Sequence, residues 1–241
     1  MLDQNFKEGA IVLIDKPYKW TSFDVVRYFS KIVGAKVGHA GTLDPLATGL
    51  LVLCTGKLTK QLSTMQADDK EYTGTFILGK STPSYDLETE VDFSAAIHHI
   101  TEERIKNAAS EFIGIQMQSA PLYSAKNIDG ERAYYKARRG EKVEVKANEI
   151  TINSFDVVDI TILEDVIKVQ FMINCSKGTY IRAIARDFAI KLDTVGYLAE
   201  LRRTRSGNFD IANAATMDDI KQKFKFEPKR VVEKQQNENS N

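Results

Sequence analysis

Apolar and polar positions along the chain divide it into short strands and amphipathic helices. Strands are predicted where apolar residues run together or alternate between glycines, prolines or polar breaks. The segments that meet this description are residues 10–14, 50–54, 72–79, 155–162 and 166–174. The last two of these flank an acidic pair, Glu164 and Asp165, and are typical of a hairpin.

Helices are predicted where apolar residues recur every three or four positions. These segments are residues 21–34, 101–114, 179–192 and 217–224. In the first of them, Thr21 or Ser22 can cap the start and Gly34 can end the helix. In the third, a continuous apolar stripe follows Thr179, which we expect to act as the N-cap.

The order of these elements mixes strands and helices without regular alternation. This order favours an α+β domain built on a largely antiparallel or mixed sheet with flanking helices. The chain has 241 residues, of which 43% are hydrophobic and 27% charged, as in ordinary globular proteins. We expect one catalytic domain over residues 1–216, then a short helix and a polar, disordered tail over 217–241.

Total charge excludes no class of partner, because 33 Lys and Arg balance 33 Asp and Glu. Residues 118–148 nevertheless interleave tyrosines with many basic side chains. Basic groups bind phosphates and aromatic rings stack on bases, so this stretch is a candidate RNA-gripping insertion. Its composition alone fits a solvated surface excursion equally well.

Cysteine usage and hydropathy indicate a cytoplasmic protein without a membrane segment. Cys54 and Cys175 lie far apart, neither belongs to a CxxC motif, and the N-terminus does not resemble a signal peptide. The longest apolar run, residues 49–54, is too short to cross a bilayer. His98 and His99 have no surrounding pattern of metal ligands, so we expect no metal site.

One carboxylate is placed in an unusual loop, "GHAGTLDPLATGLL", at residues 38–51. Asp44 precedes Pro45 and is therefore pushed toward an extended backbone. Gly41 and Gly49 permit tight turns and close approach of another chain. The residues alone leave two readings open: a rigid loop that presents one acid, or an Asp-Pro turn of the ordinary kind.

Six segments of the chain, taken together, resemble the TruB-type tRNA pseudouridine synthases. The segment at 38–60 resembles the catalytic motif of that family, and "LIDKP" at 13–17 resembles its lysine-proline motif. The others, in family order, are "DKEYTGTFILG", "SAKNIDGERAYYKARRGEKVE", "CSKGTYIRAIARDF" and "LRRTRSGNF". The third of the six resembles the tyrosine motif and the fourth the thumb-like insertion of the family.

The resemblance implies a pseudouridine synthase-like catalytic domain that acts on the T-arm stem-loop of tRNA. Such an enzyme isomerises the uridine at tRNA position 55 to pseudouridine, and it needs no cofactor, metal or obligatory protein partner. The reaction also explains the isolated acid, since one ionised carboxylate suffices as nucleophile or as stabiliser of charge at the sugar.

The resemblance also assigns roles within the catalytic site. Asp44 would be the essential acid, and Arg182 would pair with it and keep it ionised. Tyr72 would stack on the target uracil and take part in proton transfer, and Tyr180 would help to form the pocket. Leu201 would pack near the base, whereas Lys16 is expected to be structural.

Outside the catalytic site, the resemblance implies two groups that hold RNA. His39 would occupy the space left when the target base flips out of the T loop. Lys136, Arg138 and Arg139 in the insertion would bind RNA phosphates.

Two alternatives to this reading remain. One is a non-catalytic tRNA-binding folding chaperone that uses the same surface. The other is a pseudouridine synthase that acts on another RNA. The sequence also departs from many members of the family, because the residues after Ala215 are too few for a C-terminal RNA-binding domain of the PUA type.

Overall fold

A nine-stranded mixed sheet forms the framework of the protein, with strand order β1-β3-β12-β4-β11-β10-β7 and with β2 and β13 attached to β3 and β12. The computed structural model describes residues 5–121, 123, 127–128, 131–132, 139 and 147–224. The strands of this sheet are β1 (Ile11–Lys16), β2 (Val37–Ala40), β3 (Thr48–Thr55), β4 (Lys70–Leu78), β7 (Gly114–Gln118), β10 (Asn148–Ile162), β11 (Ile167–Cys175), β12 (Gly196–Ser206) and β13 (Phe209–Asp210). Two small ladders join β5 (Lys80–Ser81) to β6 (Phe93–Ser94) and β8 (Asn127–Ile128) to β9 (Glu131–Arg132).

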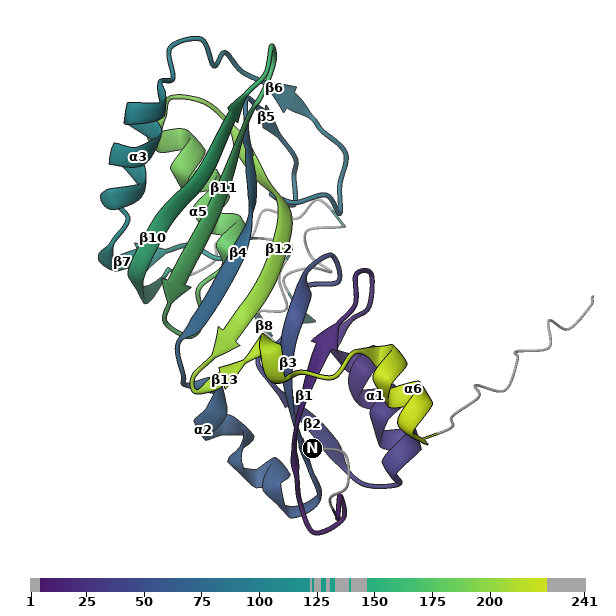
Figure 1. Ribbon diagram of the computed structural model, residues 1–241. Coiled ribbons are helices and arrows are strands. Elements are labelled where there is room, and N and C mark those ends of the chain that lie inside the picture. Colours follow the sequence, from purple (N-terminus) through teal and green to yellow (C-terminus); the bar gives the residue numbers. More distant parts are fainter. Residues whose placement is uncertain are drawn as a thin grey trace, which may run out of the picture.

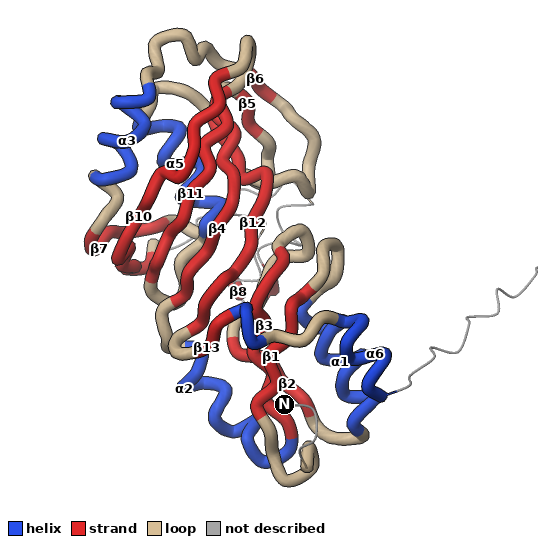
Figure 2. Tube along the Cα trace, viewed as in Figure 1, coloured by secondary structure: helices blue, strands red, loops and turns tan. Residues whose placement is uncertain are grey.

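Helices cover the sheet as two separate groups (Figures 1 and 2). The helices are α1 (Ser22–Val33), α2 (Leu62–Gln66), α3 (Glu102–Ser110), α5 (Ile181–Lys191) and α6 (Met217–Phe224), with 3₁₀ turns η1 (Gly56–Gln61) and η2 (Ile211–Asn213). Helices α3 and α5 pack on the broad part of the sheet formed by β4, β7, β10, β11 and β12. Helices α1 and α6 pack beside β1 and β3 at the other end of the sheet.

Each group of helices buries its own apolar core. The larger core centres on stacked and edge-to-face aromatic rings of Phe76, Phe155, Phe171 and Phe188. The smaller core joins Phe29 of α1 to Ile220 of α6. The α+β class and the mixed sheet predicted from the sequence are therefore confirmed.

Local sequence explains where most helices begin and end. Thr21 and Asp24 form a reciprocal capping box at the start of α1, and Gly34 ends that helix in the left-handed conformation. Thr179 was the wrong choice of cap for α5. The N-cap is Tyr180, while the Thr179 hydroxyl donates to the carbonyl of Ser176 instead.

The two halves of the sheet meet where β3 runs parallel to β12 over only two residue pairs, Thr48–Arg202 and Gly49–Arg203. Gly49 has a φ of +101°, and a Cβ atom there would lie 2.4 Å from the carbonyl oxygen of Arg203. Only glycine therefore lets the two strands approach this closely. Among the residues that the structure describes, no helix is long and apolar enough to span a membrane.

We expect Gly49→Ala to destabilise the protein more than Gly34→Ala. Both glycines have positive φ, but a Cβ at Gly34 has no heavy atom within 4 Å, whereas one at Gly49 overlaps backbone. Gly34→Ala should lower the free energy of unfolding by about 1 kcal/mol and Gly49→Ala by about 3 kcal/mol. Urea denaturation measures both, and equal losses would contradict the role assigned to the β3–β12 contact.

Candidate active site

The loop that carries Asp44 runs between β2 and β3 and is fixed by hydrogen bonds to its backbone. The hydroxyl of Ser22 accepts from the Leu43 N–H at 2.8 Å and lies 3.2 Å from the Leu43 carbonyl. The ammonium of Lys16 donates to the carbonyls of Pro45 (3.2 Å), Pro17 (3.1 Å) and Trp20 (2.5 Å). Lys16 is fully buried, as expected for a structural residue, and burial lowers its pKa to about 8 although Asp44 opposes the shift.

Arg203 braces the loop from the sheet side. This buried side chain on β12 donates from Nε to the Leu50 carbonyl at 2.7 Å and from Nη2 to the Gly41 carbonyl at 3.1 Å. These carbonyls lie on either side of Asp44 along the chain. The loop therefore holds its acid in place through side chains from β1, α1 and β12.

Arg182 contacts Asp44 with two of its nitrogen atoms. The Nε–Oδ2 distance is 3.0 Å and the Nη2–Oδ1 distance is 3.2 Å. The side chain of Arg182 is 4% exposed, whereas that of Asp44 is 36% exposed. The contact predicted between these residues is therefore present, with the arginine buried and the carboxylate open to the cleft.

Asp86 holds the other side of the same guanidinium. Its Oδ2 lies 3.5 Å from Nη1 of Arg182, which also donates to the Ser84 carbonyl at 3.3 Å. Burial raises the pKa of Asp86, although the charge of Arg182 opposes the shift. Burial alone would lower the pKa of Arg182, but Asp44 and Asp86 outweigh it and raise the pKa above its usual value. Sequence analysis did not assign a role to Asp86.

A cleft of about 620 Å³ opens beside Asp44 and Arg182. Its lining includes Tyr72, Tyr180 and Leu201, so all three side chains predicted for the base pocket do line it. Tyr72 is buried on β4, and burial raises its phenolic pKa while the nearby Arg203 opposes the shift. Its hydroxyl is therefore protonated at neutral pH and can donate a hydrogen bond.

His39 and Arg139, the predicted RNA-holding residues that the structure describes, are not among the residues that line this cleft. His39 is half-buried on β2, and its Nδ1 is a buried atom without a hydrogen-bond partner in the described structure. Burial lowers the pKa of the His39 ring, with the charge of Arg203 acting in the same direction. Arg139 is exposed in a turn, whereas Lys136 and Arg138 lie outside the described residues.

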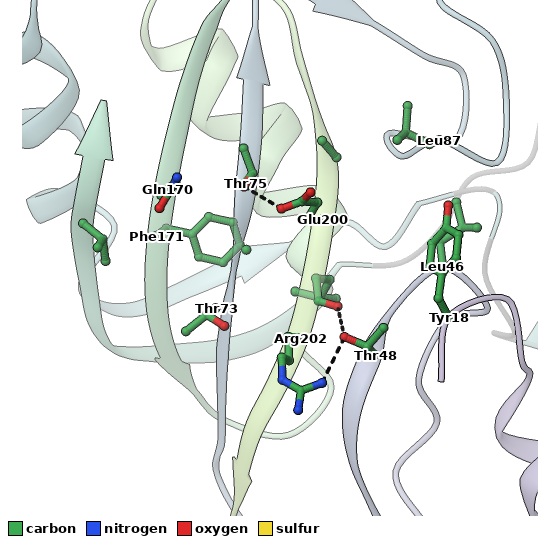
Figure 3. Close-up of a pocket in the computed structure, with 14 residues that line it drawn as sticks. Tyr18, Leu46, Thr48, Thr73, Thr75, Leu87, Gln170, Phe171, Glu200 and Arg202 are labelled. Atoms are coloured by element: carbon green, nitrogen blue, oxygen red, sulfur yellow. Dashed lines mark hydrogen bonds between the residues drawn. The ribbon is translucent and has the colours of Figure 1, made fainter. Parts of the chain in front are cut away.

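A second hollow, of about 740 Å³, lies on the other face of the same strands (Figure 3). Thr73 and Arg202 line this second hollow, whereas the adjacent Tyr72 on β4 and Arg203 on β12 line the first cleft. Because successive side chains of a strand point to opposite faces of the sheet, the two hollows lie on opposite faces. Arg202 is paired there with Asp15 at 2.7 and 3.0 Å. Because Asp44 and Arg182 converge only in the first cleft, we take that cleft as the candidate active site.

Known proteins of the same architecture include pseudouridine synthases. Residues 29–181 match the model of the TruB family pseudouridylate synthase N-terminal domain. Residues 182–236 match the tRNA pseudouridylate synthase B C-terminal domain. The tRNA pseudouridine synthase B of Flavobacterium johnsoniae is 46% identical over 222 residues, covering 89% of this chain and 95% of the relative. That of Chloroherpeton thalassium is also 46% identical, covering 90% of this chain and 91% of the relative.

Solved structures agree on the fold. The crystal structure of a Cbf5–Nop10–Gar1 complex contains a chain that matches with a TM-score of 0.68 and 25% identity, over 92% of this chain and 58% of that chain. An H/ACA RNP bound to a substrate RNA containing 2′-deoxyuridine matches with a TM-score of 0.67 and 23% identity, over 94% of this chain and 58% of that chain. This chain thus spans less than two thirds of either neighbour. On the sequence matches, which cover most of its length, the chain belongs to the TruB family of pseudouridylate synthases.

Proposed function

We propose that this protein isomerises the uridine at position 55 in the T loop of tRNA to pseudouridine, with Asp44 as the essential acid. Membership of the TruB family makes the chain a tRNA pseudouridine synthase, which is an isomerase. The observation that carries the catalytic assignment is the accessible carboxylate of Asp44 held against the buried guanidinium of Arg182.

The chemistry needs one ionised acid rather than a pair. The N1–C1′ bond of the uridine breaks, the uracil turns, and a C5–C1′ bond forms while the proton from C5 is lost and N1 gains one. Asp44 either attacks the sugar as a nucleophile or stabilises the positive charge that develops there. Glycosidases, by contrast, use two carboxyl groups because water must be activated and a leaving group protonated.

Arg182 fixes the orientation of Asp44, because both carboxylate oxygens face guanidinium nitrogens. Asp86 and the Ser84 carbonyl hold the far side of that guanidinium. Tyr72 lies in the same cleft, where its ring would stack on the uracil and its hydroxyl would assist a proton transfer. Tyr180 and Leu201 would complete the walls around the base.

The target base is stacked inside the folded T loop and must be flipped out to reach Asp44. His39, half-buried on β2, would enter the space that the base leaves. The insertion at about 118–148, with Lys136, Arg138 and Arg139, would grip the phosphates of the T arm. We place the reaction in the cytoplasm without an obligatory protein partner.

Two other functions are weaker on specific grounds. A tRNA folding chaperone would need neither an accessible acid nor a buried arginine against it, and both are present. A synthase for another RNA would share this chemistry. The relatives that match nearly the whole chain carry the name tRNA pseudouridine synthase B, which favours tRNA.

We expect Asp44→Asn to abolish isomerisation while tRNA binding survives, because the change keeps the size of the side chain and removes its charge. The rate should fall at least about a thousandfold, roughly 4 kcal/mol of transition-state stabilisation. Pseudouridine formation in labelled tRNA and a filter-binding assay measure the two effects. Asp15→Asn is the matched control, since Asp15 pairs with Arg202, which lines the other hollow, and this variant should keep wild-type activity. Turnover near wild type in Asp44→Asn would refute the assignment.

An isolated T-arm hairpin should be modified almost as well as whole tRNA. Base flipping, stacking on Tyr72 and insertion of His39 all require only the loop and its adjoining helix. The test compares kcat/KM for the hairpin and for full tRNA at one salt concentration, with a hairpin carrying cytidine at the target as the control. A hairpin slower by a hundredfold, about 2.7 kcal/mol, would show that essential contacts lie elsewhere on the tRNA.

A further inference from the structure

The start of α5, with its N-cap, carries three residues that line the cleft, yet it lacks a side-chain cap of its own. Tyr180 is the N-cap residue, and its side chain makes no capping hydrogen bond. Its carbonyl accepts the first helical bonds, from the N–H groups of Ala183 and Ile184. Arg182 follows two residues later, so any shift of the Tyr180 backbone moves the arginine that contacts Asp44.

Gln118 supplies the missing support from a different strand. It is the last residue of β7, and its side chain is buried, with the residue 5% exposed. Its Oε1 accepts from the Tyr180 N–H at 2.8 Å, and its Nε2 donates to the Tyr180 carbonyl at 3.1 Å. One side-chain amide thus binds both backbone groups of one residue, which fixes that residue in position and in orientation.

The neighbouring glutamine on the same strand shows that this contact is particular to Gln118. The Nε2 of Gln116 donates to the Phe112 carbonyl at 2.7 Å, only four residues away, and within the described part of the chain Gln116 makes no hydrogen bond to α5. Gln118 instead reaches across 62 residues of sequence to the helix that bears Arg182. Buried polar groups must be paired, but a local partner would have met that need equally well.

A second tie joins the same parts of the molecule. Arg186, one turn along α5 from Arg182, donates from Nη2 to the carbonyl of Ser119 at 3.3 Å. The guanidinium of Arg186 also lies 5.3 Å from the ring centroid of Tyr85. In the sequence, Tyr85 stands between Ser84 and Asp86, the two residues that hold the far side of Arg182. The end of β7, the first turns of α5 and the segment 84–86 are therefore joined around the catalytic arginine.

We infer that Gln118 is a positioning residue for the isomerisation: it fixes the backbone of Tyr180 and so sets where Arg182 meets Asp44. The inference rests on the proposed roles of Asp44 and Arg182. It predicts that Gln118 affects the chemical step rather than tRNA affinity, because its side chain faces α5 and is buried away from solvent.

The test replaces Gln118 with Met, which has similar length but cannot make either hydrogen bond, and uses Gln116→Met as the matched control. Single-turnover rates and dissociation constants are measured on whole tRNA, and thermal melting checks folding. Gln118→Met should lower the rate about tenfold, as expected for two lost hydrogen bonds, with a dissociation constant within about twofold of wild type. Gln116→Met should keep the wild-type rate. Gln118→Glu retains the acceptor for the Tyr180 N–H and should give an intermediate rate.

A double-mutant cycle with Arg182→Lys separates positioning from general destabilisation. If Gln118 acts through Arg182, adding Gln118→Met to Arg182→Lys should cost much less than it costs in the wild type. Fully additive losses, a loss confined to tRNA affinity, or an unchanged rate in Gln118→Met would each overturn the inference. Should Gln118→Met fail to fold, Gln118→Glu decides: a several-fold slower rate supports the inference and a wild-type rate overturns it.

The same experiment distinguishes this inference from the proposed function on which it rests. A wild-type rate in Arg182→Lys would remove the proposed role of Arg182, and the inference would fall with it. If Arg182→Lys lowers the single-turnover rate while Gln118→Met keeps the wild-type rate, only the proposed role of Gln118 is refuted.

Discussion

A buried guanidinium held between two carboxylates is the constraint on which the rest of the site depends. A cation removed from water must be paired and hydrogen-bonded, or it destabilises the fold strongly. Arg182 meets this requirement with Asp44 on one side and with Asp86 and the Ser84 carbonyl on the other. Pairing this buried cation therefore brings together the loop before β3, the segment after β5 and the first turn of α5.

This arrangement also divides the roles of the two acids. Asp86 is almost fully buried. Its carboxylate accepts a hydrogen bond from the backbone N–H of Glu88 and pairs with the guanidinium of Arg182. Asp44 has the more exposed side chain and faces the cleft. One arginine thus pairs with a buried acid and with the acid that faces the cleft, which suits the proposed reaction with its single carboxylate. The rigid loop around Asp44, fixed by Lys16, Ser22 and Arg203, keeps that acid in one place.

Sequence reasoning succeeded where local chemistry determines structure. The Thr21 cap of α1, the alternating hairpin of β10 and β11, and the α+β class follow from spacing and turn residues. Asp44 was singled out by its loop, but its role and its pairing with Arg182 came only from the family resemblance, since 138 residues separate the two. Asp86 and Gln118 were missed because the partner of each comes from a distant element. Thr179 was misassigned because a threonine before a helix is a common cap, whereas here Gln118 binds the Tyr180 backbone.

The most direct test of the central claim is the single-turnover rate of Asp86→Asn at saturating tRNA. This variant removes the charge that holds the far side of Arg182 and leaves Asp44 untouched. Asp165→Asn, which breaks the exposed pair with Lys80, is the control. If Asp86 orients Arg182, the rate should fall between tenfold and a hundredfold, roughly 1.4 to 2.7 kcal/mol, while tRNA affinity and the control stay at wild-type values. A rate for Asp86→Asn within about twofold of wild type would contradict the account.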